Sequence, residues 1–286
     1  MGEAGSAIVS GWGQTGERPI RAYDIKSDDP QTTATMTARY RRLGIDGCTS
    51  DAEAVQGAEL VFSTVTADQA VVAAQSAAPH LERGAFWCDL NSCAPSSKHR
   101  AAQFIEAEGG RYVDVAVMAP VHPKLNMVPL LICGPHAETV GPLLAELPMS
   151  ARIVAGGVGA ASSIKMIRSV MIKGLEALTA ECMLAAVAAG VEEEVLASLA
   201  RTYPGTDWSA RAAYNFERTM VHGARRAAEM EEVAKTLTDL GLPDDMVRAT
   251  VCWQRRIAAA DVTAPEDART AGAKALADLL LPVLRS

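Results

Sequence analysis

The stretch GGVGAASSIKMIRSVMIKG (residues 156–174) divides the sequence into two parts of different character. Before it, short apolar runs rich in β-branched residues alternate with amphipathic helical patterns, which is typical of a parallel sheet covered by helices on both faces. After it, Ala, Leu, Glu, Met and Arg dominate, and nothing between Ala160 and Ala189 would break a helix. We therefore predict a Rossmann-like α/β domain over residues 1–157 and an all-α domain over residues 158–286.

The alternation in the first part predicts six strands and at least three helices. The expected strands are Pro19–Tyr23, Leu60–Val65, Ala85–Asp89, Tyr112–Val117, Val128–Cys133 and Ile153–Ala155. The expected helices are Thr32–Leu43, Asp68–Leu81 and Ser97–Glu108.

Composition excludes several classes of protein. The 286 residues are 49% hydrophobic and 21% charged, which is typical of a folded globular protein. A net charge of −7 argues against a nucleic acid or an anionic membrane as partner. The six scattered cysteines lack metal-binding spacing, so we expect no metal site and a reducing, cytoplasmic location. We expect no signal peptide and no membrane span, since the most apolar long segment, Met171–Val191, carries three charges.

The opening MGEAGSAIVSGWG (residues 1–13) contains half of a dinucleotide-binding fingerprint. Gly2 and Gly5, with Glu3 and Ala4 between them, have the spacing of the last two glycines in G-x-G-x-x-G, the turn that places a pyrophosphate at a helix N-terminus. The first glycine and the strand that should carry it are missing from the sequence, and we expect residues upstream of Met1 to supply them.

Polar residues after three expected strands complete the predicted nucleotide site. Asp24 follows the first strand and would accept hydrogen bonds from the ribose hydroxyls of NAD, whereas Lys26 could form an ion pair with the extra phosphate of NADP. The choice between NAD and NADP stays open. Val65 and Thr66, with Asn91 after the next strand, are expected around the nicotinamide, because ligands bind at the carboxyl ends of parallel strands.

Lys165 falls in the first turns of the predicted long helix. Ser162, Arg168 and Ser169 share its helical face, because each lies three or four residues from it. Such a face suits a small, anionic, hydroxylated substrate.

A second charged stripe runs along the helical domain at Arg218, His222, Arg225 and Glu229. Its spacing allows two interpretations: an anion-binding wall for substrate, or a solvated face on which Arg225 pairs with Glu229. For Arg218 and His222 both interpretations stay open.

The junction resembles that of the β-hydroxyacid dehydrogenases, which include the 3-hydroxyisobutyrate and 6-phosphogluconate dehydrogenases. Their motif G-x-x-G-x-G-x-x-x-K-x-x-x-N is matched here by Gly156, Gly159 and Lys165, with Ala161 and Ser169 in place of the third glycine and the asparagine.

Three other segments carry the same resemblance. FWCDLNSCAP (residues 86–95) is similar to the family's strand-end segment, and YVDVAVMAP (residues 112–120) to its D-A-P-V-S-G-G substrate loop. Met118, Ala119 and Pro120 stand where Ser-Gly-Gly would bind a carboxylate. The second half, with YPGTDW and RTMVHGARRAAEM, resembles the branch whose phosphogluconate-dehydrogenase-like C-terminal domain has no assigned function.

The resemblance implies a function. It implies a homodimeric NAD(P)-dependent oxidoreductase acting on CH–OH donors such as small β-hydroxy acids, with Lys165 as general acid/base and Ser169 beside it. Alternatives are an oxidative decarboxylase of the 6-phosphogluconate type and a nucleotide-binding regulator without turnover. An imine reductase is a further alternative, against which Lys165 counts.

Overall fold

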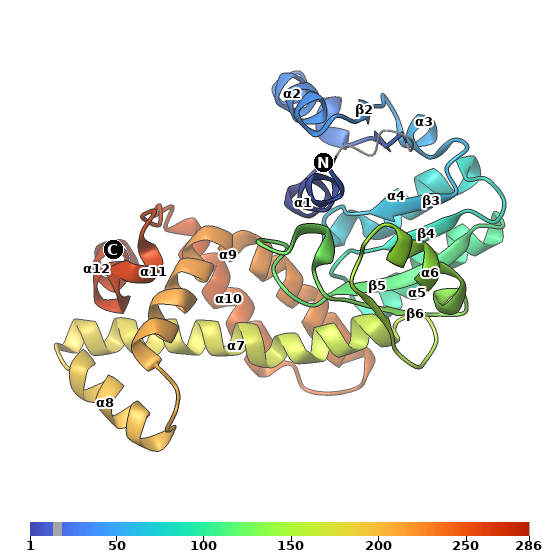
Figure 1. Cartoon of the computed structure of the whole chain (residues 1–286). Coiled ribbons are helices and arrows are strands. Elements are labelled where there is room, and N and C mark those ends of the chain that lie inside the picture. The colour runs from blue at the N-terminus through green and yellow to red at the C-terminus, as the bar shows by residue number, and fades with distance from the viewer. Residues whose placement is uncertain (14–18, 286) are drawn as a thin grey trace. The chain divides into compact units, whose positions relative to one another are not determined.

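The computed structural model describes residues 1–13 and 19–285, and Figure 1 shows its helices and strands in order. The chain forms two compact units, Met1–Met166 and Ile167–Ser286. All strands of the described residues lie in the first unit, and the second is built from helices. The division into domains after residue 157 stays a prediction, since the first unit also contains the first turns of the long helix α7 (Ala160–Ala189).

The first unit holds two separate sheets. The strands are β1 (Arg21–Ala22), β2 (Asp46–Gly47), β3 (Leu60–Ser63), β4 (Phe86–Asp89), β5 (Arg111–Val117), β6 (Leu130–Cys133) and β7 (Ala151–Ile153). β1 and β2 pair as a two-stranded sheet, and β3 to β7 form a five-stranded sheet in sequence order. No strand among the described residues joins the two sheets.

The expectation of a purely parallel sheet is wrong at one position, because β5 and β6 pair antiparallel. Parallel neighbours need a crossover of a dozen or more residues that usually contains an α-helix. The connection between β5 and β6 contains only the 3-10 helix η4 (Leu125–Met127), so the chain returns directly and the strand direction reverses. The other pairs in both sheets are parallel, as predicted.

The expected strands are confirmed in position, with two differences at the margins. β7 begins and ends two residues before the expected Ile153–Ala155. β2 was not expected, because its two residues, Asp46 and Gly47, carry no apolar run that would indicate a strand.

Both faces of the large sheet are covered by helices. Successive side chains of a strand point to opposite faces, so the partners of alternate residues show which helices cover each face. The helices of this unit are α1 (Glu3–Trp12), α2 (Thr33–Leu43), α3 (Asp51–Val55), α4 (Ala70–Ala77), α5 (Pro95–Ala107) and α6 (Ala137–Glu146). Phe86 and Cys88 of β4 belong to the core cluster shared with α1 and α6. Trp87, between them, packs with Tyr112 in the cluster shared with α4 and α5. β4 is therefore buried on both sides.

The second unit is a helical bundle whose longest member, α9 (Trp208–Asp239), lies beside α10 (Asp245–Ala259), as Figure 1 shows. Its other helices are most of α7, then α8 (Glu192–Thr202), α11 (Ala268–Ala271) and α12 (Ala273–Leu284). Helix α7 has the predicted bounds, Ala160–Ala189. The core of the unit includes Met183 of α7, Phe216 of α9 and Leu276 of α12.

Buried ion pairs join α7 to α9 within this bundle. A guanidinium nitrogen of Arg226 lies 2.6 Å from a carboxylate oxygen of Glu176, and both side chains are almost inaccessible to solvent. Lys173 pairs with Glu229 at 3.0 Å. Burial raises the pKa of Glu176 above its ordinary value, while Arg226 and Lys173 act in the opposite direction. The pair therefore depends on having both partners present.

Removing one member of the Glu176–Arg226 pair should destabilise the protein strongly. We expect Glu176→Leu or Arg226→Met to lower the free energy of unfolding by about 3–5 kcal/mol, since either leaves an uncompensated buried charge. The double variant should lose much less than the sum of the two. Urea unfolding followed by circular dichroism measures each value.

The exposed Lys274–Asp278 pair provides the control, because Lys274→Met removes a solvated ion pair 3.3 Å long. Its loss should change the unfolding free energy by about 0–1 kcal/mol. Additive losses in the Glu176/Arg226 double variant would contradict a coupled buried pair.

Candidate functional site

The glycine turn at Gly2–Gly5 and the carboxylate of Asp24, which are two parts of the predicted nucleotide site, lie next to each other in the first unit. Helix α1 begins at Glu3, with Gly2 as its N-cap and no side-chain cap. The ammonium group of Met1, one residue earlier, forms an ion pair with Asp24, which follows β1. The glycine turn and the predicted ribose-binding carboxylate are therefore neighbours, although 19 positions separate Gly5 from Asp24 in the sequence.

Asp24 is held ionised. Burial raises the pKa of this carboxyl, but hydrogen bonds, among them the one that the backbone N–H of Lys26 donates to Asp24 Oδ1 at 3.0 Å, lower it below its ordinary value. Through the same bond Asp24 caps the 3-10 helix η1 (Ile25–Ser27). An ionised carboxylate accepts hydrogen bonds and donates none, as a contact with ribose hydroxyls requires.

Gly2 and Gly5 have different surroundings. A Cβ atom on Gly5 would lie 2.8 Å from Thr64 Oγ1, so α1 approaches the segment after β3 closely enough to need glycine there. A Cβ atom on Gly2 would meet no protein atom within 4 Å. In the dinucleotide fingerprint the last glycine allows close packing of the helix and the one before it allows the pyrophosphate to approach the backbone. The residues present fit that group.

The carboxyl ends of β3 and β4 carry the predicted nicotinamide-side residues. Val65 and Thr66 follow β3 and are exposed. Asn91 is buried, and its amide donates to Ser63 Oγ at 2.9 Å, which ties the ends of the two strands together. Val65 and Thr66 are thus open to a ligand, whereas Asn91 supports the edge.

Lys165 lies at this same edge of the sheet. Its Nζ donates to Ser92 Oγ at 2.5 Å, and Ser92 directly follows Asn91 at the end of β4. The ammonium group is half-buried. The structure thus brings together Lys165 and Asn91, which are 74 positions apart in the sequence.

Below this edge lies a buried ion cluster, Asp89–Lys98–Asp114, that the sequence analysis did not identify. Lys98 Nζ lies 3.0 Å from Asp89 Oδ1 and 3.5 Å from Asp114 Oδ1, and none of these side chains is accessible to solvent. The two carboxylates raise the pKa of Lys98 although burial lowers it. Lys98 therefore stays a cation.

The signal for this cluster was present in the sequence. Lys98 occupies the first position of an i, i+3, i+4, i+7 pattern whose other members, Ala101, Ala102 and Ile105, form the buried face of α5. A charged residue on an apolar face indicates a buried ion pair, since burial of an unpaired charge is strongly unfavourable.

Asp114 also holds the start of α7. Its Oδ2 accepts hydrogen bonds from the backbone N–H groups of Gly159 and Ser162, both at 3.1 Å, and its Oδ1 accepts one from Ser162 Oγ at 2.6 Å. The Cys133 thiol donates to Asp114 as well, and burial together with that carboxylate raises the thiol pKa to about 11. A carboxylate at a helix N-terminus stabilises the helix by satisfying its free N–H groups.

The residues that replace the family's Ser-Gly-Gly follow β5 directly. The backbone N–H of Met118 donates to the carbonyl of Pro129 at 2.9 Å, so that amide is used within the protein. Ala119 packs against the core of the first unit, and Pro120 is exposed. The apolar side chains here offer no charge to a carboxylate.

The remaining predicted substrate residues belong to the second unit. Arg168 is exposed, and buried Ser169 accepts a hydrogen bond from Lys173 Nζ at 3.2 Å. Arg218 is buried and acts electrostatically on Glu176 and Arg226, so its charge is shared with the bundle's internal ion pairs. His222 is half-buried. The expected ion pair of Arg225 with Glu229 is present at 4.0 Å.

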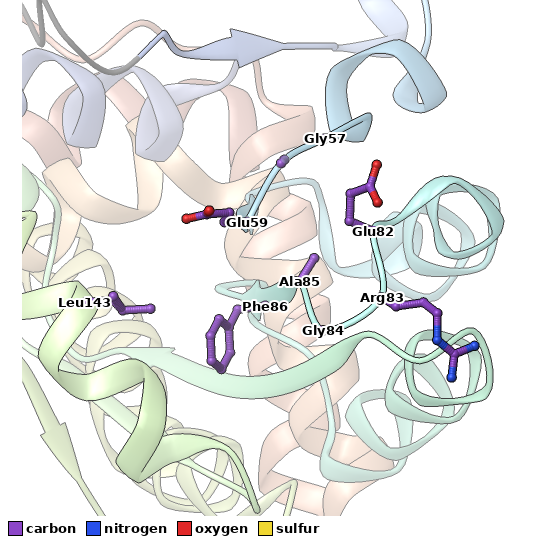
Figure 2. Close-up of a pocket in the computed structure, with 9 residues that line it drawn as sticks. Gly57, Glu59, Glu82, Arg83, Gly84, Ala85, Phe86 and Leu143 are labelled. Atoms are coloured by element: carbon purple, nitrogen blue, oxygen red, sulfur yellow. The ribbon is translucent and has the colours of Figure 1, made fainter.

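A hollow elsewhere on the first unit lies at the opposite ends of the strands. Figure 2 shows its lining, which comes from the segments just before β3 and β4 and from α6. The labelled residues include Glu59, Glu82, Arg83 and Leu143. No predicted site residue lines this hollow, and the carboxyl ends of the strands remain the candidate site.

Two further observations concern the described residues only. No group of three or more His, Cys, Asp or Glu side chains in residues 1–13 and 19–285 is arranged to hold a metal ion. None of the helices in that part of the chain combines the length and apolarity needed to cross a bilayer.

Comparison with solved structures places this geometry among known folds. A conserved hypothetical protein from Sinorhizobium meliloti 1021 is 38% identical, with a TM-score of 0.76 over 99% of this chain and 94% of that one. A conserved protein of unknown function, described as structurally similar to 3-hydroxyacid dehydrogenases, is 28% identical, with a TM-score of 0.68 over 94% and 95%. The 3-hydroxyisobutyrate dehydrogenase of Mycobacterium tuberculosis, solved with L-serine, shares the fold at 15% identity, with a TM-score of 0.70 over 90% and 91%.

Family profiles match both parts of the chain. Residues 186–257 match a domain of unknown function, DUF1932. Residues 1–147 match the NAD binding domain of 6-phosphogluconate dehydrogenase, which confirms NAD or NADP as the cofactor. That match spans more than half of the sequence, and it agrees with the glycine turn, Asp24 and the sheet edge. The chain therefore belongs to the family of proteins that carry the NAD binding domain of 6-phosphogluconate dehydrogenase.

Proposed function

We propose that this protein is an NAD(P)-dependent oxidoreductase that transfers a hydride between the nicotinamide and a small β-hydroxy acid or related alcohol. Lys165 is the general acid/base. The observation that carries the proposal is the 2.5 Å hydrogen bond from Lys165 to Ser92, which holds an amine at the carboxyl edge of the sheet that carries the predicted nicotinamide-side residues.

The first unit has the residues to hold the cofactor. The start of α1, from Gly2 through Glu3 and Ala4 to Gly5, takes the pyrophosphate at a helix N-terminus. Asp24 takes the ribose hydroxyls, with Lys26 beside it, and Val65 and Thr66 contact the nicotinamide half. The cofactor, when bound, supplies the hydride acceptor or donor.

Lys165 accepts and returns the proton of the substrate hydroxyl. As a neutral amine, it takes the proton of the substrate hydroxyl while the hydride leaves the carbinol carbon, and it returns that proton in the reverse direction. Its hydrogen bond to Ser92 orients the nitrogen, so the amine does not have to be ordered when substrate arrives. Positioning of this kind is what a proton transfer in the transition state requires.

The substrate is a small anion, and the residues with which this chain binds it differ from the Ser-Gly-Gly loop of the family. Met118, Ala119 and Pro120 supply an apolar wall in place of a carboxylate-binding loop. Arg168 and Ser169, one turn beyond Lys165 on α7, supply charge and a hydroxyl. Half-buried His222 of α9 is a further substrate-binding residue in this proposal, whereas the predicted Arg218 is buried and acts within the ion pairs of the bundle.

The protein acts as a homodimer formed through α7. Ile167, Met171 and Leu178 are 50%, 62% and 59% exposed and lie four and seven residues apart, which places them on one helical face. An apolar helix stripe of this kind suits the same stripe on a second copy, in an isologous contact.

Loss of the Lys165 amine should abolish most of the turnover. We expect Lys165→Met to lower kcat by roughly 10²–10⁴-fold, the usual contribution of a positioned acid/base, while NADH binding measured by fluorescence is unchanged. The assay follows NADH or NADPH absorbance with a panel of β-hydroxy acids and measures released CO₂, which distinguishes simple oxidation from oxidative decarboxylation. Lys235→Met, a surface lysine of α9, is the control. Full activity of Lys165→Met would remove this lysine from the mechanism.

Gly2 provides a test of the pyrophosphate site. Since a Cβ atom there meets no protein atom within 4 Å, Gly2→Val should leave the Tm of the cofactor-free protein unchanged. The added side chain would obstruct the pyrophosphate, so we expect the Kd for the dinucleotide to rise at least about tenfold, equivalent to about 1.4 kcal/mol. Titration calorimetry measures the affinity, and an unaltered Kd would argue against this site.

The α7 stripe can be tested by charge. Met171→Glu should convert the dimer to a monomer in light scattering after size-exclusion chromatography, because like charges would face each other across the two-fold axis. Met246 of α10 is 69% exposed, and Met246→Glu is the matched control. A dimer that persists in Met171→Glu would place the interface elsewhere.

A further inference from the structure

We infer that the buried Asp89–Lys98–Asp114 cluster is a positioning device that holds Lys165 against Ser92. This inference rests on the proposed role of Lys165, and it assigns three residues to that site which touch neither substrate nor cofactor. Each half of the Lys165–Ser92 pair is attached to a different end of the cluster.

The Ser92 end is fixed through Asp89. Lys98 Nζ donates to the backbone carbonyl of Asp89 at 2.7 Å in addition to its ion pair with the Asp89 carboxylate. Asp89 Oδ1 accepts from the backbone N–H of Asn91 at 2.9 Å, and Asp89 Oδ2 accepts from Tyr112 OH at 2.6 Å. The turn that leads from β4 into Ser92 is thereby held on both sides of Asp89.

The Lys165 end is fixed through Asp114. The carboxylate accepts hydrogen bonds from Gly159 and twice from Ser162, and it therefore binds the first turn of α7 directly. Lys165 comes three residues after Ser162, less than one helical turn away. A shift or rotation of the helix start would move the Lys165 amine by a similar amount.

Lys98 connects the two ends. Its ammonium group is 3.0 Å from Asp89 and 3.5 Å from Asp114, so one cation sets the separation of two buried carboxylates. Removing that cation would leave two buried carboxylates without a counter-charge, so that one of them would take up a proton and the ionic link between Asp89 and Asp114 would be lost. The distance between Ser92 and the start of α7 would no longer be specified.

Stability alone does not require such a cluster at this place. Lys98 sits on the buried face of α5 with Ala101, Ala102 and Ile105, where a cluster of apolar side chains could take the place of all three charged ones. Well-packed apolar residues often stabilise a fold as well as a buried ion pair does. A network of buried ion pairs and hydrogen bonds instead fixes the relative positions of the segments it joins. Here those segments are the end of β4, which leads to Ser92, and the start of α7, which leads to Lys165.

A double-mutant cycle on the chemical reactivity of Lys165 tests the inference without any turnover. The rate of Lys165 acylation by an N-hydroxysuccinimide ester, measured by peptide mass spectrometry on the cofactor-free full chain, reports the state of the amine. Ser92→Ala should change this rate about fivefold, a coupling of about 1 kcal/mol. In the Lys98→Met background Ser92→Ala should have no further effect, because the pair is already separated.

Two more variants keep the result interpretable if Lys98→Met is poorly folded. Lys98→Met/Asp89→Asn also removes one of the two buried carboxylates that have lost their partner, so it should recover stability but not the Ser92 effect. Arg226→Met removes another buried, ion-paired cation, from the second unit, so it should lose stability and keep the Ser92 effect in full.

The outcomes separate this inference from the proposed function. A Ser92 effect of equal size with and without Lys98 would overturn the positioning role, whatever the enzyme does. Full turnover by Lys165→Met would overturn the proposed function, and the acylation cycle would still decide whether the cluster holds Lys165. A lowered kcat for Lys98→Met without loss of the Ser92 effect also counts against positioning.

Discussion

The carboxylate of Asp114 is the point on which the first unit and its candidate site depend. It forms an ion pair with Lys98, which also pairs with Asp89. It also accepts hydrogen bonds from backbone N–H groups at the start of α7. A helix of 30 residues needs such an acceptor at its N-terminus when that end is buried. The same contact decides where Lys165 lies, so the beginning of the helix and the candidate catalytic amine share one support.

The site combines a rigid base with an open edge. Below the edge, burial without solvent makes every hydrogen bond of the cluster stronger and every missing partner more costly. Above it, Val65 and Thr66 are exposed and the start of α1 carries no side-chain cap. Rigid positioning underneath and a helix N-terminus without a side-chain cap above suit the binding of a dinucleotide. The family match supports NAD or NADP as the cofactor of this unit, and in the proposed function the start of α1 and the sheet edge hold it.

Sequence reasoning located most of the fold and missed what depended on short or polar elements. The strands with apolar runs and helix α7 were predicted because their periodicity is local. β2 consists of Asp46 and Gly47 and has no such run, and the reversal at β6 goes with a connection that lacks an α-helix and not with any strand pattern. Four of the six cysteines are buried, but Cys182 and Cys252 are exposed on helices, and no local signal in the sequence distinguishes them.

By itself the sequence indicated the class of fold through its alternating patterns. It also indicated the half fingerprint at Gly2 and Gly5, the acid at Asp24 and the candidate lysine, because each is read from residue types and their spacing along the chain. Only the tertiary structure decided which charges are buried together. Lys98 meets Asp114, Asp114 meets Ser162 across 48 positions of sequence, and Arg218 belongs to an internal ion network of the bundle. The free energy of a charge depends on what surrounds it after folding, and spacing along the chain carries no information about that environment.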